Sequence, residues 1–104
     1  MTLYVKRRIP VEAIQVLPDN HDEVLKFVGT YDSSDKVGDS IEEPYVRFGN
    51  SQHAHSVLDR LHDAWIPFEY GDWIIRGVQG ELYPHKGDLF PQVYEEYTDE
   101  ADRT

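Results

Sequence analysis

The chain has 104 residues, of which 39% are hydrophobic and 29% charged, so it can form one domain with one modest core, burying roughly 65% of its extended surface. It contains no cysteine, which excludes disulfide bonds, thiolate nucleophiles and cysteine-ligated zinc or iron–sulfur clusters. Its 20 acidic and 10 basic side chains give a net charge of −10, which disfavours direct binding to DNA or RNA, because such binding needs a basic surface.

The first part of the chain predicts one strand and one helix. Residues 11–17 place β-branched and apolar side chains on two faces and predict a strand that ends at Pro18. Residues 21–28 repeat apolar side chains at helical spacing, so we expect a two-turn helix closed by Gly29. Residues 30–43 are rich in Ser, Asp and Gly with little to bury, which is typical of turns rather than of regular structure.

The middle of the chain is ambiguous. Residues 45–48 predict a short strand. Over residues 53–65, four large apolar side chains fit one helical face: Val57, Leu58, Leu61 and Trp65. The flanking segments favour strands, so a strand is the alternative, and the helical spacing makes a helix the favoured prediction.

The final third predicts a meander of antiparallel strands. Turn pairs at Gly71–Asp72 and Gln79–Gly80 separate three short apolar segments, at 66–70, 73–78 and 81–83. Residues 84–87 form a break, after which Asp88 can begin a short turn of helix.

These elements predict one α+β domain over residues 1–97. We expect a small antiparallel β-sheet, a meander, packed against one or two short helices, with an acidic, frayed tail at 98–104. No apolar run reaches the roughly 18 residues that cross a membrane, and the amino end lacks the pattern of a signal peptide. We therefore expect no membrane association, and a protein that stays in the compartment where it is made.

Two segments resemble a known family. Residues 71–97, GDWIIRGVQGELYPHKGDLFPQVYEEY, and residues 4–20, YVKRRIPVEAIQVLPDN, resemble the two ends of a family of small phage and prophage proteins with the pattern GD(Y/W)IIxGVxGExYPxKxDxF. The resemblance implies a phage or prophage origin and a location in the host cytoplasm, and it supplies no catalytic residues. Gly87 stands where proline is usual and His85 where cysteine is common, so no cysteine-based function carries over.

The histidines raise the question of a metal. His53 and His55 would share one side of a strand, with His62 further on and Asp59 or Asp63 nearby, which permits a three-ligand site. A His-x-His pair in a polar loop is more often an ordinary surface feature. We therefore expect no metal and no other cofactor.

Catalytic patterns are equally sparse. Ser56 lies beside His55 without the Gly-x-Ser-x-Gly elbow of a hydrolase, and the Gly-rich phosphate-binding motifs are absent. Four carboxylates near the predicted turns could divide acid and base roles, although each has a simpler explanation as a turn or strand-end residue: Glu69, Asp72, Glu81 and Asp88. We expect a protein that acts by binding and is not an enzyme.

Two sets of charged residues are candidate binding surfaces. Cations and aromatic rings could form a pocket for a ligand or partner: Lys6, Arg7, Arg8, Trp73, Arg76, Tyr83 and Lys86. The alternative is that these cations pair with the surplus carboxylates. An acidic interaction surface is predicted in the polar segment that follows the helix: Asp32, Asp35, Asp39, Glu42 and Glu43.

The favoured function is that of a stoichiometric inhibitor of a host protein, a component of antiviral defence or of nucleic-acid metabolism, which it would bind by nucleic-acid mimicry. Aromatic side chains would anchor the contact, with these candidates: Tyr31, Tyr45, Trp65, Tyr70, Tyr94 and Tyr97. One alternative is a sponge that sequesters a small signalling nucleotide, and another is an accessory or structural phage protein. Exposed strand edges and the many aromatic residues favour a homodimer.

Overall fold

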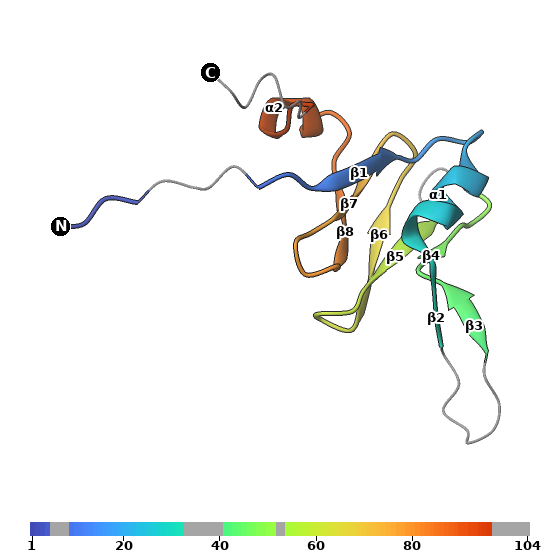
Figure 1. Cartoon of the computed structure of the whole chain (residues 1–104). Helices are drawn as coiled ribbons and strands as arrows, with labels where there is room; N and C mark the ends of the chain where they lie inside the picture. The colour runs from blue at the N-terminus through green and yellow to red at the C-terminus, as the bar shows by residue number, and fades with distance from the viewer. Residues whose placement is uncertain (5–8, 33–40, 52–53, 97–104) are drawn as a thin grey trace.

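The strands form three small antiparallel sheets, seen in a computed structural model that describes residues 1–4, 9–32, 41–51 and 54–96 (Figure 1). The first sheet has the order β1-β7-β8, from strands Glu12–Gln15, Trp73–Arg76 and Leu82–His85. The second has the order β4-β5-β6, from Val46–Arg47, His55–Asp59 and Ala64–Phe68. A separate hairpin pairs β2, Thr30–Asp32, with β3, Glu42–Pro44.

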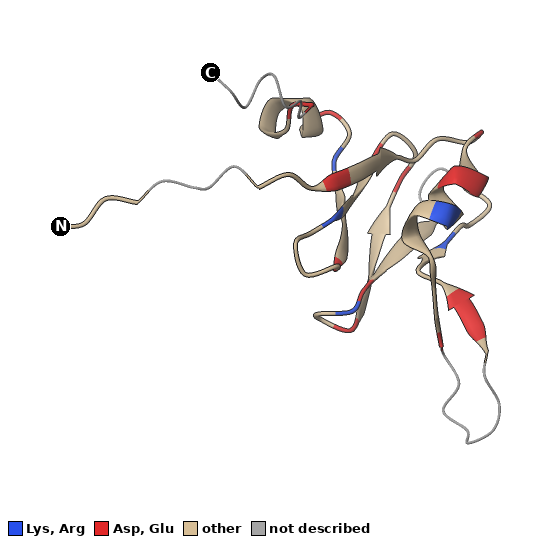
Figure 2. Cartoon of the chain, in the orientation of Figure 1, with Lys and Arg blue, Asp and Glu red and all other residues tan. Residues whose placement is uncertain are grey.

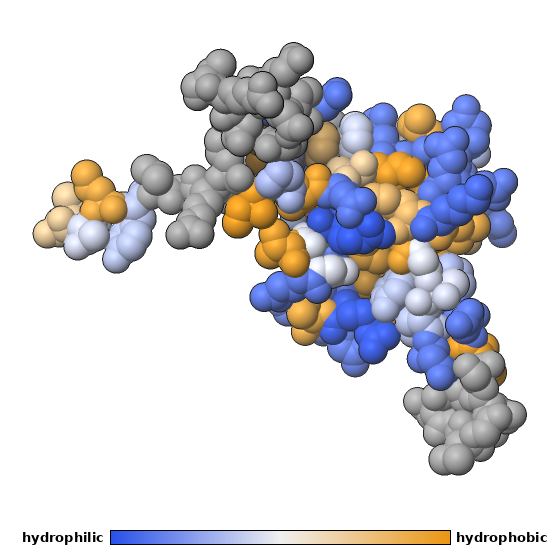
Figure 3. Space-filling model, viewed as in Figure 1, coloured by the Kyte–Doolittle hydropathy of each residue, from blue (hydrophilic) through white to orange (hydrophobic). Residues whose placement is uncertain are grey.

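Two short helices accompany the sheets, which confirms the predicted α+β class. Helix α1, His21–Val28, coincides with the predicted helix, and Gly29, at φ 75°, ends it with an N–H that donates to the Leu25 carbonyl. Its outer face is hydrophilic (Figure 3), whereas Val24 and Val28 are buried. Helix α2, Phe90–Val93, lies beside the first sheet, on the side away from α1 (Figure 1). Within the described residues, neither helix is long and apolar enough to span a membrane.

The core lies between the first sheet, the second sheet and α1. Side chains from all three are at most 5% exposed: Val16, Val24, Val28, Val46, Val57, Phe68, Ile74 and Leu82. Alternation along the strands explains this arrangement, since Ile74 of β7 faces this core while Ile75, also fully buried, faces the opposite side. Trp73, which alternation places on the same face as Ile75, stacks on Phe90 of α2.

The helix expected over residues 53–65 is wrong. Within the described part of this range, β5 and the start of β6 form a hairpin in which Val57 is paired with Ile66 and Leu58 with Trp65. Leu61 is 54% exposed at the turn, and Asp63 takes a positive φ of 50°, which reverses the chain. The helical spacing was coincidental: β5 is the central strand between β4 and β6, and its adjacent residues Val57 and Leu58, which point to opposite faces of the sheet, are both buried.

The expectation of irregular turns over 30–43 is wrong at both ends. Thr30 pairs with Pro44 and Asp32 with Glu42, so the two ends of this polar segment are strands that pair with each other. Residues 33–40 lie outside the described part. Propensity alone misses such strands, because cross-strand contacts decide them.

The predicted meander is partly wrong as well. Strands β7 and β8 form the expected hairpin, but β6 pairs with β5 and not with β7. Gly71–Asp72 therefore carries the chain from the second sheet to the first. Strand β8 also runs through Pro84 and His85, where a break was expected, because an edge strand tolerates a proline. The predicted tail at 98–104 lies outside the described residues.

Candidate functional site

An acidic hairpin projects from the body of the molecule (Figures 1 and 2). We use this name for strands β2 and β3, whose described acidic side chains are Asp32, Glu42 and Glu43. Asp32 and Glu42 are exposed and stand directly opposite each other in the ladder, and Glu43 stands opposite Tyr31. The structure thus brings three of the five predicted acidic residues together, while Asp35 and Asp39 lie outside the described residues.

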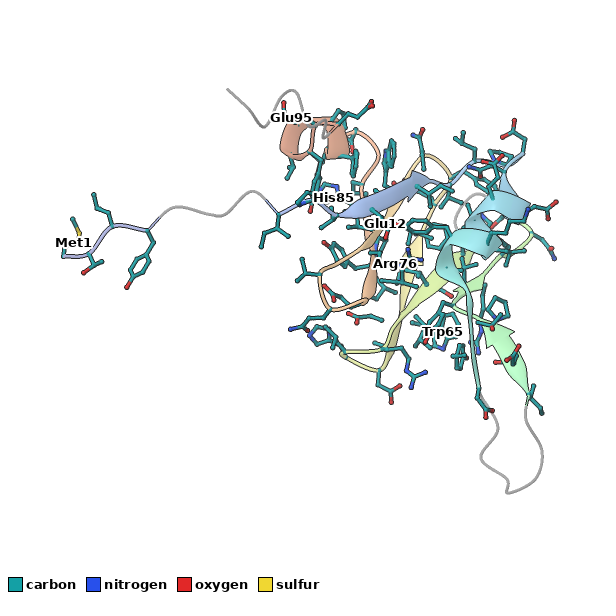
Figure 4. The ribbon with its side chains drawn as sticks, in the orientation of Figure 1. Met1, Glu12, Trp65, Arg76, His85 and Glu95 are labelled. Carbon is teal, nitrogen blue, oxygen red and sulfur yellow. The ribbon has the colours of Figure 1, made fainter. Side chains whose placement is uncertain are left out.

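A groove of about 450 Å³ opens at the base of this hairpin. We call it the arginine–aromatic groove, and five strands and the β5–β6 turn supply its lining: Tyr31, Asp32, Glu43, Arg47, Leu58, Arg60, Asp63 and Trp65. Figure 4 shows Trp65 beside the hairpin. The groove is polar and open, and it adjoins the acidic hairpin through Tyr31, Asp32 and Glu43.

Aromatic rings hold the two arginines of this groove. The guanidinium carbon of Arg47 lies 3.8 Å from the ring centroid of Trp65, and that of Arg60 lies 5.6 Å from the ring of Tyr31. The Tyr31 hydroxyl donates to Glu43 Oε2 at 3.2 Å. Desolvation, together with the neighbouring Glu43 carboxylate, raises the pKa of Tyr31. Tyr31 therefore stays a neutral hydrogen-bond donor in the groove.

A second cavity of about 380 Å³ lies on the other side of Leu58 and Arg60, which line both cavities. Its wall is half apolar, formed by Val28, Tyr45, Leu61 and Leu82 together with polar residues of the β7–β8 turn. Arg76 contributes to it but is already engaged, because its guanidinium donates to the Phe27 carbonyl and to Glu12 Oε1 at 3.2 Å. Arg76 thus serves to attach α1 to the first sheet.

The predicted cation pocket is not assembled among the described residues. In the β7–β8 ladder Arg76 pairs with Leu82 and Trp73 pairs with His85, so Arg76 and His85 lie at opposite ends of the hairpin (Figure 4). Lys86 directly follows His85 and is therefore remote from Arg76. Lys86 Nζ lies 3.9 Å from Glu69 Oε1 and 3.8 Å from Asp72 Oδ2. Arg76 and Lys86 thus both face carboxylates, which was the alternative to a cation pocket. Lys6, Arg7 and Arg8 lie outside the described residues.

The predicted pocket residues Trp73 and Tyr83 instead belong to an aromatic cluster beneath α2. Trp73 stacks on Phe90 with centroids 4.1 Å apart, and Phe90 stacks on Tyr94 at 4.9 Å. Desolvation and a hydrogen bond with Tyr94 raise the pKa of Tyr83 to about 12. These contacts dock α2 on the first sheet, so Trp73 and Tyr83 have a structural role.

The Gly71–Asp72 pair of the family-like pattern is also structural. Gly71 takes a φ of 96°, and its N–H donates to the Val16 carbonyl. The buried Asp72 carboxylate accepts hydrogen bonds from the Glu69 and Gly87 N–H groups, both at 3.1 Å. A proline at position 87 could not donate, so the departure from the family pattern at Gly87 matches the local hydrogen bonding.

The predicted metal ligands His55 and His62 have different environments. His55 is buried and accepts a hydrogen bond from the Gly49 N–H at Nδ1, whereas His62 is exposed and lies 2.7 Å from the Asp59 carboxylate. Among the residues that the structure describes, no three metal-binding side chains gather. His53 lies outside this part of the chain.

Sequence reasoning missed Arg47 and Arg60, the two cations of the groove. A hairpin reading of residues 55–68 would have placed Arg60 at its turn and Trp65 opposite Leu58. Comparisons with protein-family models, curated proteins and solved structures find no match to this chain. The likeness to phage proteins therefore stays an expectation that depends on the motif residues themselves.

Proposed function

We propose that this protein acts by stoichiometric binding, with the acidic hairpin docked on a basic surface of a partner protein. The observation that carries this proposal is the pairing of Asp32 with Glu42. This pairing places two exposed carboxylates side by side on the hairpin, and basic side chains of a partner would complement them. The net charge of −10 adds long-range attraction to such a surface.

The partner that fits this chemistry is a host protein with a basic groove of the kind that accepts nucleic acid. The exposed carboxylates would take the place of phosphates, and Tyr31 and Trp65 beside the hairpin would supply aromatic anchors. The resemblance to phage proteins supports a target in host antiviral defence and a location in the host cytoplasm. A homodimer is compatible with this proposal, because the hairpin would be presented once by each copy.

The test begins with affinity purification of the whole protein from defence-competent host cells, followed by native mass spectrometry to read the stoichiometry. The double variant Asp32→Asn/Glu42→Gln should then lower the association rate with the captured protein. Its matched control is Asp88→Asn/Glu96→Gln, which removes the same charge from exposed positions near α2.

Charge-driven docking predicts a steep fall of the association rate between low and high salt, and a flatter profile for the hairpin variant. Equal effects of the two variants would show that overall charge, not the hairpin, drives binding. A salt-independent rate would contradict nucleic-acid mimicry.

A further inference from the structure

We infer that the arginine–aromatic groove binds a mononucleotide, a small ligand with one planar base and one phosphate. This proposal goes beyond the protein docking proposed above, because nucleotide binding needs no partner protein, although Tyr31, Asp32 and Trp65 belong to both surfaces. The groove also differs from the predicted pocket around Arg76 and Lys86, both of which face carboxylates.

The placement of the two arginines is the first observation. Asp32, Glu43 and Asp63 line the same groove, yet among the described residues neither Arg47 nor Arg60 forms an ion pair with a carboxylate. Each guanidinium lies over an aromatic ring instead. Stacking occupies the face of a guanidinium and leaves N–H donors in its plane, the geometry that receives a phosphate through two parallel hydrogen bonds.

The aromatic rings are the second observation. Tyr31 and Trp65 are half-buried, with centroids 6.4 Å apart and planes tilted by 56°. The Tyr45 ring contacts Tyr31, with centroids 5.1 Å apart and planes tilted by 46°, so the Tyr31 ring is held in place before any ligand arrives. Aromatic rings that line a groove and are held in place can stack a nucleobase, and such stacking does not depend on which base it is.

Size and charge limit the ligand further. The volume of about 450 Å³ falls in the range of small-molecule sites. The lining holds two guanidinium groups, which can hold one phosphate, and three carboxylates, from which each additional phosphate of a ligand would meet added repulsion. The exposed Asp63 carboxylate in the same lining can accept an N–H group of a base. These properties select a mononucleotide over a triphosphate or a nucleic acid.

Tryptophan fluorescence gives a direct test, because the chain has two tryptophans and Trp73 is stacked against Phe90 outside the groove. In a Trp73→Phe variant the emission comes from Trp65 alone. Titration of the full-length variant with cyclic AMP, AMP and GMP should give saturable quenching by at least one of them. ATP should bind more weakly, and adenosine or inorganic phosphate alone should bind more weakly still. Calorimetry on the unchanged protein checks each affinity.

The variants Arg47→Gln and Arg60→Gln should each weaken binding roughly tenfold, as expected for the loss of a charge-assisted hydrogen bond. The matched control Lys26→Gln removes an exposed cation from α1 and should leave the affinity unchanged. Circular dichroism establishes that each variant is folded. No saturable signal with any mononucleotide would overturn the site, as would equal affinity for adenosine or an equal effect of Lys26→Gln. Either result leaves docking through the hairpin standing, because that docking is measured with the partner protein.

Discussion

The backbone N–H of Gly87 donates a 3.1 Å hydrogen bond to the Asp72 carboxylate, although the two residues belong to different turns of the fold. Asp72 is 5% exposed, and its second oxygen accepts from the Glu69 N–H. A Cβ atom at position 87 would lie 2.0 Å from the Gly71 carbonyl oxygen. One buried carboxylate thus joins the end of β8 to the turn between the sheets, and the Gly71 carbonyl leaves no room for a side chain at position 87.

Replacement of Gly87 by proline should destabilise the fold, even though proline is usual at this position in the family that the sequence resembles. The Gly87→Pro variant loses the N–H that Asp72 needs and forces a Cβ atom against Gly71. We expect a loss of about 2 kcal/mol in the free energy of unfolding, measured by urea denaturation. An unchanged midpoint would show that the turn can rearrange at no cost.

Truncation of Phe90 should release α2 from the first sheet. The Phe90→Ala variant removes the ring that stacks on both Trp73 and Tyr94, and because Phe90 is half-buried we expect a loss of about 2 kcal/mol. The emission of Trp73 should shift to the red as water reaches it. The control Val93→Ala truncates a side chain of the same helix that is 64% exposed, and it should change neither stability nor emission.

Acid should weaken the β5–β6 hairpin through Asp59. The hydrogen bond from His62, helped by the Leu61 N–H, lowers the pKa of Asp59 below its ordinary value of 3.8. A carboxylate with a lowered pKa stabilises the fold above pH 3.8, and this contribution is lost as the pH falls from there through the lowered pKa. The Asp59→Asn variant should be less stable at neutral pH and should show a flatter loss of stability below pH 3.8, measured by denaturation across pH.

Alkaline pH should destabilise the fold through ionisation of Tyr83. Because desolvation and Tyr94 raise its pKa from 10.0 to about 12, the folded state favours the neutral phenol. The associated stability is complete below pH 10 and declines as the pH rises toward 12, since the unfolded chain ionises first. In a Tyr83→Phe variant this decline should diminish, and absorbance titration of the tyrosines should lose a step near pH 12. Persistence of that step in the variant would assign it to another tyrosine.

Local signals in the sequence were sufficient for some elements and not for others. Helix α1 was predictable because its apolar spacing and the glycine that ends it lie within nine consecutive residues, 21–29. The β5–β6 hairpin was not, because Val57, Leu58, Leu61 and Trp65 also fit a helix, and only the ladder with β4 and β6 resolves the ambiguity. The acidic residues of the hairpin were foreseen, although their pairing as strands was not.

The candidate site shows the same division. Tyr31 and Trp65 were among the expected aromatic anchors, because a large ring in a polar segment is conspicuous in a sequence. Arg47 and Arg60 were missed because they are 13 positions apart in the numbering, and only the pairing of β4, β5 and β6 places both beside the rings. Contacts between strands, which depend on the whole fold, therefore determine the groove.

The ladder between β1 and β7 has a consequence for how the chain is made. Glu12 is paired with Arg76, 64 positions later, whereas β5 and β6 are joined by a tight turn. On a ribosome the β5–β6 hairpin has both of its strands early, while β1 waits without its neighbour until most of the protein has been synthesised. Closure of the first sheet is thus a late event, and during translation the amino-terminal strand is a free edge.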